Sequence, residues 1–176
     1  MSFPWPAPVR LNEIGRSGRT ITVDADGSAR ARIAKDLGLE ALHAFSAEVE
    51  LKPWLDGAEL TARWSAVIAQ ICGVTVETFD TALEGAFTVR CLPEGSPNAP
   101  EEDAEALIDP EGDDPPDVLE QPVIDVGAYL IEHLALEIDP FPRKPGAVFE
   151  PREPETPASP FAVLKAFPTR PPNKSD

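Results

Sequence analysis

The sequence predicts an α+β domain in which an antiparallel sheet, a meander of at least three strands, is packed by one main helix. Apolar and polar residues alternate along residues 59–71 and again along residues 84–92, as they do in strands with one buried face. Residues 123–138 instead place apolar side chains on one broad face of a helix. We therefore expect this helix to lie across one face of the sheet and to close the core.

The first part of the chain supplies an arm and smaller elements. Residues 1–8 alternate proline with aromatic side chains, which favours an extended arm packed on the domain; a proline–aromatic ligand for a partner is the alternative. Residues 9–11 predict the start of a short strand, and residues 20–24 predict an edge strand. Residues 29–37 predict a helix that ends at Gly38.

Three antiparallel strands in sequence order form the predicted meander. Residues 46–54, 59–71 and 84–92 each alternate with a period of two. Asp56-Gly57 is a strong two-residue turn signal between the first two strands. Residues 72–83 are left to connect the second strand to the third.

An acidic segment follows the third strand. Residues 93–121 hold eleven acids, six prolines and no lysine or arginine. This composition buries too little apolar surface to offset the entropy of ordering, so it predicts a disordered acidic loop within a single domain of residues 9–146. This segment is either a solvated insert without a function of its own, or a segment that attracts a basic partner or mimics nucleic acid.

The predicted main helix has a cap, two faces and an abrupt end. Asp125 can cap its first turn. The apolar face comprises Gly127, Leu130, Ile131, Leu134, Ala135 and Ile138. The opposite face carries Asp125, Tyr129, Glu132, His133 and Glu137. The prolines of residues 139–146 end the helix and hold the next stretch extended.

A proline-rich tail, residues 147–176, closes the chain. Within it, residues 160–167 predict a short amphipathic helix. Its apolar side chains are Phe161, Leu164 and Phe167. Such an island either docks on a partner or packs back on its own domain, and the sequence leaves both alternatives open.

The net charge is strongly negative, −16 from 31 acids and 15 bases. An acidic surface without a basic cluster repels phosphate backbones, so direct nucleic-acid binding by the domain is disfavoured and a basic protein partner fits better. The sequence shows no signal peptide and no apolar run near the ~20 residues that span a bilayer. We therefore expect a cytoplasmic protein without membrane contact; its oligomeric state is left open.

The titratable residues predict no catalysis. Cys72 and Cys91 fall at two adjacent predicted strands, which leaves a disulfide geometrically open, but nothing marks the chain as secreted and we expect free thiols. Cys72, His133 and Asp125 can be written as a nucleophile system, yet Asp125 and His133 lie eight residues apart on one helix, about 12 Å in rise. His43 and His133 show no metal-ligand spacing with the acids. We expect no enzyme, no metal site and no cofactor.

Several ordered motifs run from about residue 45 to residue 167. They are Gln70-x-Cys72-x-x-Thr75-x-Glu77 at a strand end, an acidic proline-rich segment, a helix from Ile124-Asp125-Val126-Gly127 through Leu134-Ala135-Leu136-x-x-Asp139-Pro140-x-Pro142-Arg143, and Ser159-Pro160-Phe161-Ala162-Val163-Leu164. Together they resemble the YceD family, the large ribosomal RNA subunit accumulation proteins, in its alphaproteobacterial form. Many members carry C-x-R-C at the strand end, whereas Val74 and Thr75 stand here at the Arg and second Cys positions. A metal or redox role of paired thiols is therefore not expected to carry over.

The resemblance implies a cytoplasmic, non-enzymatic factor needed for accumulation of the large-subunit (23S) ribosomal RNA, and gives no mechanism. An acidic surface would steer it to a basic ribosomal protein or a large-subunit precursor. As the binding surface we favour Gln70, Cys72, Thr75 and Glu77 with Asp139, Pro142 and Arg143. A tight, self-satisfied turn is the alternative for the first four. The rival function is an acidic regulatory adaptor that binds a non-ribosomal protein through Phe161, Leu164 and Phe167.

Overall fold

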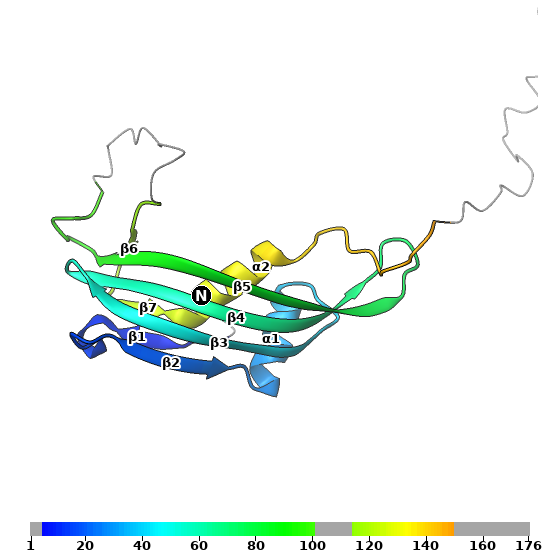
Figure 1. Cartoon of the computed structure of the whole chain (residues 1–176), viewed down its shortest axis with the longest axis horizontal. Coiled ribbons are helices and arrows are strands. Elements are labelled where there is room, and N and C mark those ends of the chain that lie inside the picture. The colour runs from blue at the N-terminus through cyan, green and yellow to red at the C-terminus, as the bar shows by residue number, and fades with distance from the viewer. Residues whose placement is uncertain (1–4, 101–113, 150–176) are drawn as a thin grey trace, which may run out of the picture.

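A five-stranded sheet in the order β2-β3-β4-β5-β6 forms the body of the molecule (Figure 1). The computed structural model describes residues 5–100 and 114–149. The strands of this sheet are β2 Arg19–Asp24, β3 Ala41–Trp54, β4 Gly57–Ile71, β5 Thr78–Pro93 and β6 Asp117–Leu119. Strands β2 to β5 are antiparallel neighbours, and β6 pairs parallel to the end of β5. The α+β class and the antiparallel meander are confirmed.

The meander strands are longer than predicted. β3 begins at Ala41 and β5 at Thr78, so only residues 72–77 connect β4 to β5. The predicted connection of residues 72–83 is therefore wrong. Its second half lies on an edge strand whose side chains are mostly exposed or half-exposed, which weakens the contrast that reveals a buried face.

The β3–β4 turn lies one residue earlier than predicted. Trp54 pairs with Gly57, and the two-residue loop between them is Leu55-Asp56. Gly57 is the first residue of β4, and a Cβ there would collide with the carbonyl oxygen of Cys91 on β5. The glycine is thus needed for the close approach of β5 rather than for the turn itself.

The core lies between one face of the sheet and two helices. Helix α1 (Gly27–Asp36) packs mainly on β3, and helix α2 (Val126–Glu137) contacts β4 and β5. The buried residues of both helices and of the inner sheet face form one hydrophobic cluster. The core therefore needs both helices rather than one. α1 follows a cap in which the Asp26 carboxylate accepts from the Ala29 N–H at 2.7 Å.

A second, two-stranded sheet ties the N-terminal part to the start of α2. β1 (Pro8–Arg10) pairs antiparallel with β7 (Val123–Asp125), and a short 3-10 turn, Leu11–Glu13, follows β1. The predicted helix of residues 123–138 is therefore wrong in its first three residues. The partner strand lies more than a hundred residues away in sequence, so no local pattern reports the pairing.

The predicted acidic loop, residues 93–121, is structured at both ends. Pro93 ends β5, and Asp117–Leu119 form β6, so disorder is wrong for these parts. Residues 101–113 lie outside the described part of the chain, as do residues 1–4 and the predicted helix of residues 160–167. Across residues 5–100 and 114–149, no helix is long and apolar enough to cross a membrane.

Candidate functional site

The β4–β5 turn, residues 72–77, forms the first half of the candidate site. Its backbone closes on itself, because the Cys72 N–H donates to the Glu77 carbonyl and the Val76 N–H donates to the Cys72 carbonyl, both at 2.9 Å. Val76 adopts φ of +60°, which is sterically costly for a β-branched residue, and its side chain is 78% exposed. The turn therefore holds an apolar side chain out in solvent in a strained conformation.

Three backbone N–H groups surround the thiol of Cys72. Val74 and Thr75 donate to Sγ at 3.4 Å, and Lys144 donates at 3.3 Å from a different part of the chain. The hydroxyl of Thr75 and the N–H groups of Lys144 and Thr75 lower the pKa of Cys72 to about 6. The side chain is buried, so this sulfur acts as an acceptor that joins two segments.

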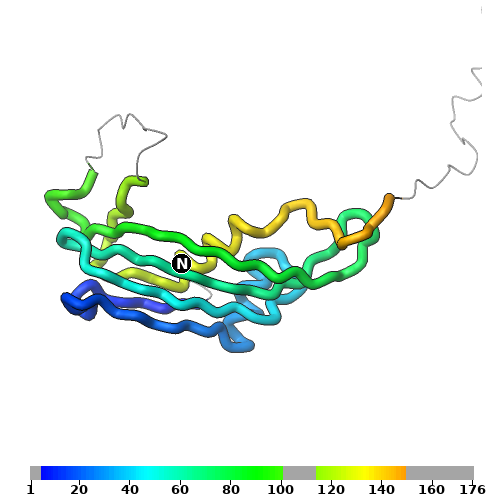
Figure 2. Tube along the Cα trace, viewed as in Figure 1, coloured from blue at the N-terminus to red at the C-terminus, as the bar shows by residue number. Residues whose placement is uncertain are grey.

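The post-helix segment, residues 139–144, forms the second half and lies against the turn (Figures 1 and 2). The Gly73 N–H donates to the Pro142 carbonyl at 2.9 Å. Nε2 of the buried Gln70 donates to the Asp139 carbonyl at 3.1 Å. The structure thus brings together six of the seven predicted binding residues: Gln70, Cys72, Thr75, Glu77, Asp139 and Pro142. Their role in binding a partner stays a prediction.

One salt bridge also joins the two halves. Nζ of Lys144 lies 2.9 Å from Oε2 of Glu77, which also accepts from the Thr75 hydroxyl at 3.4 Å. The Lys144 ammonium lowers the pKa of Glu77 below its usual value. Sequence reasoning passed over Lys144 because half of its role runs through its backbone N–H, which every residue except proline has. Arg143, the seventh predicted residue, is exposed beside it.

Three of the exposed residues of the site are large and apolar. Ile71 ends β4, Val76 lies in the turn and Phe141 lies in the post-helix segment, with 44%, 78% and 81% exposure. We call these three residues the apolar rim. The polar residues selected from the sequence mostly bond to the site itself, as the self-satisfied-turn alternative expects. A partner would therefore meet the apolar rim together with exposed polar side chains such as Glu77 and Arg143.

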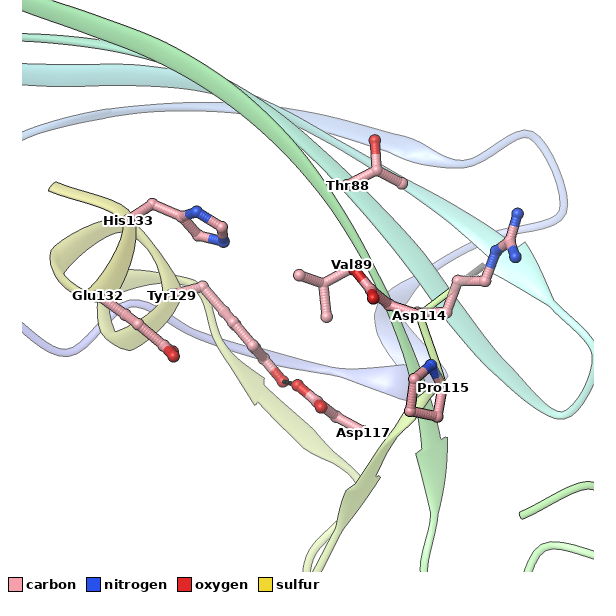
Figure 3. A pocket seen from close by; sticks show the side chains of 9 residues that line it. Thr88, Val89, Asp114, Pro115, Asp117, Tyr129, Glu132 and His133 are labelled. Atoms are coloured by element: carbon pink, nitrogen blue, oxygen red, sulfur yellow. Dashed lines mark hydrogen bonds between the residues drawn. The ribbon is translucent and has the colours of Figure 1, made fainter. Parts of the chain in front are cut away.

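A separate cavity of about 550 Å³ lies between β5, the segment before β6, and α2 (Figure 3). The Tyr129 hydroxyl donates to Oδ2 of Asp117 at 2.7 Å and lies 3.4 Å from Sγ of Cys91. Burial is the main cause that raises the pKa of Tyr129, and burial also raises the pKa of Cys91. His133 stacks on Phe87 with ring centroids 3.7 Å apart, and burial lowers its pKa.

This arrangement corrects the predicted faces of α2. Tyr129 and His133 are half-buried because that flank of the helix faces β5, whereas Ala135, predicted inside, is exposed. Asp125 caps the helix as predicted, since its Oδ1 accepts from the Gly127 and Ala128 N–H groups at 3.1 and 3.4 Å.

The structure does not assemble the nucleophile system that the sequence allowed. Cys72 lies in the β4–β5 turn, His133 packs on Phe87 and Asp125 bonds to backbone. The two cysteines are free and lie at opposite ends of the hairpin, about 40 Å apart along β5. His43 pairs with Asp80 across the outer face of the sheet, at 3.2 Å. Among the described residues, no group of three or more His, Cys, Asp or Glu side chains is placed to hold a metal ion.

Comparison with known families decides the identity of the chain. Residues 60–167, more than half of the sequence, match the family model described as large ribosomal RNA subunit accumulation protein YceD. The chain belongs to the YceD family. The YceD match includes the β4–β5 turn and the post-helix segment, and the family name supports a role in ribosome biogenesis. No curated protein and no solved structure matches the chain.

Proposed function

We propose that this protein is a cytoplasmic, non-enzymatic factor in biogenesis of the large ribosomal subunit. It would act by binding a basic ribosomal protein or a precursor particle that contains one. Membership of the YceD family carries this proposal, because the family is named for accumulation of the large ribosomal RNA. The net charge of −16 adds support, since it favours basic protein surfaces over bare RNA.

The candidate site supplies the contact surface of this proposal. Its backbone and polar side chains are bonded across two segments, which fixes the shape of the turn before any partner arrives. The apolar rim then offers Ile71, Val76 and Phe141 to a partner at little cost in ordering. Exposed apolar side chains mark a contact surface where they lie together in one patch, and the proposal assigns that role to the apolar rim.

Sedimentation of cell extract through a sucrose gradient tests the proposal. The tagged protein should migrate with precursors of the large subunit at low salt and leave them at raised salt, because screening weakens the steering by its charge. Migration with small proteins alone would instead favour the regulatory adaptor. Crosslinking in cells, followed by identification of protein and RNA neighbours, separates contact with a ribosomal protein from contact with RNA.

Paired variants test the surface. Val76→Ser and Phe141→Ser remove exposed apolar side chains and should weaken the association without changing the fold. Leu55→Ser is the matched control, because Leu55 is 61% exposed but lies in the turn at the opposite end of β4. Equal effects of all three variants would contradict a contact surface at the apolar rim.

A further inference from the structure

Strand β5 presents a long edge without a strand partner in the described part of the chain. On one side, β5 pairs with β4 continuously from Thr78 to Cys91. On its other side it pairs only with β6, through Cys91, Leu92 and Pro93. Alternate residues of an antiparallel strand direct both N–H and C=O to the side away from their partner. Residues 78–90 therefore offer about 40 Å of open hydrogen-bonding edge.

Within the described residues, pairing at this edge ends at β6 and the rest of the edge is open. Pro115 and Pro116 stand directly before β6 and have no N–H groups, so β6 cannot extend along residues 88–90 with a complete ladder. Edge strands are commonly closed by lysine, proline or a β-bulge. Residues 78–90 contain neither lysine nor proline, and the β4–β5 register shows no shift. The strand at the opposite edge of the sheet, β2, has only six residues and therefore offers a much shorter edge.

The charges near this edge select a basic occupant. Asp80 and Glu84 lie exposed on β5 itself. Asp114, Asp117 and Glu132 are exposed at the cavity beside its second half. The one lysine or arginine of β5, Arg90, is bonded to Glu59 at 3.0 Å and lies over the ring of Trp54.

The cavity can accept every second side chain of an added strand. It lies on the inner side of the edge, where Val89 faces Tyr129, Glu132 and His133 of α2 (Figure 3). In strand addition, main-chain bonds supply affinity and pockets for every second side chain supply specificity. A lysine or arginine that enters this cavity meets carboxylates, so the cavity and the edge favour the same chemistry.

We propose that the free edge of β5, residues 78–90, binds an extended basic polypeptide segment as an added strand. The inference deepens the proposed function and rests on it only for the class of partner, a basic protein of the large subunit. The binding mode rests on the edge, the cavity and the charges alone. The second surface, the apolar rim, would then hold a different part of the same partner.

A synthetic probe tests the binding mode in the full-length protein. The probe is a labelled peptide of about a dozen alternating lysine and threonine residues, long enough to cover the edge. Its binding should slow hydrogen exchange at alternate amides of residues 78–90 by about tenfold or more. Glu84→Lys should weaken binding about fivefold, because it reverses a charge on the edge. Asp36→Lys, the same charge change on α1, should leave the affinity within about twofold because it is remote from the edge.

Two backbone-methylated peptides separate strand addition from charge attraction. Each is N-methylated at every second residue, in opposite phase, so that charge and composition stay equal. One should lose binding because its missing donors face β5, and the other should bind as the parent does. Equal binding by both, or slow exchange of these amides in the free protein, would overturn the inference. Absence of binding by the parent peptide would also overturn it.

Sedimentation keeps this inference apart from the proposed function. If the peptide fails while the protein still migrates with large-subunit precursors, the edge inference is wrong and the function stands. If the peptide binds as an added strand while the protein never meets ribosomal components, the edge inference stands and the function is wrong.

Discussion

Asp125 should be one of the most costly carboxylates to remove, because it stabilises two parts of the fold at once. Its Oδ1 accepts from the N–H groups of Gly127 and Ala128 in the first turn of α2. The same atom accepts from the N–H of Ala7 at 3.0 Å, 118 residues earlier in the chain. Asp125→Ala therefore removes a helix cap and the side-chain bond that joins the N-terminal strand to α2.

The magnitude follows from these two losses. Loss of an N-cap side chain costs about 1 kcal/mol. Loss of the long-range bond leaves the part-buried N–H of Ala7 without this partner, which costs about 1–3 kcal/mol. We expect Asp125→Ala to lower the free energy of unfolding by about 2–4 kcal/mol in total.

Urea unfolding followed by circular dichroism measures this change, with the denaturant slope expected to stay constant. Asp26→Ala is the matched control, because Asp26 caps α1 through the Ala29 N–H and its carboxylate makes no contact with a distant strand. It should cost about 1 kcal/mol. Equal losses for the two variants would refute the view that Asp125 holds the β1–β7 pair on α2.

Three further predictions follow from the described contacts. In a Cys91→Ala background, thiolate absorbance should titrate with a midpoint near pH 6, as the lowered pKa of Cys72 requires; a midpoint near 9, the ordinary value of the thiol, would contradict the N–H contacts. Because the folded state binds fewer protons than the unfolded state between these values, the stability of the wild type relative to Cys72→Ala should rise from pH 6 to pH 9 and become independent of pH below pH 6, as measured by urea unfolding. Gly127→Ala should lower the thermal unfolding midpoint sharply, because its Cβ would collide with the Trp5 carbonyl, whereas Gly15→Ala should change it little because nothing lies within 4 Å.

The fold is predicted best where buried and exposed residues alternate within one continuous segment of the sequence. β4 alternates sharply because one of its faces is buried from Ala58 to Ile68, so its bounds were almost correct. The first half of β5 was missed because it is an edge strand with a weaker contrast. The β1–β7 pair was missed because its two strands lie far apart in sequence. Tyr129 and His133 were placed outside because a helical wheel cannot report that β5 covers that flank.

The candidate site shows a different limit of sequence reasoning. The sequence predicts a binding role for the polar motif around Cys72, and the structure brings most of its residues together with the post-helix segment. The pattern could not show whether those residues face inward or outward. Lys144 was missed because it donates to Cys72 through its backbone N–H, and a backbone donor does not depend on the residue type. The apolar rim was missed because Ile71 ends the predicted strand of residues 59–71 and Val76 lies in the predicted connection of residues 72–83.

Some residues of the site hold its shape through hydrogen bonds, whereas others are exposed and free to touch a partner. The two groups need different tests. Cys72 and Glu77 bond mainly within the site, so their removal would change the shape of the turn whether or not a partner touches them. Loss of association in such variants would therefore not identify the contact surface. The exposed side chains of Val76 and Phe141 make no contribution to that framework through side-chain hydrogen bonds, so their removal reports contact directly. Loss of association in the rim variants at unchanged thermal stability is the combination that places the partner at this end of the sheet.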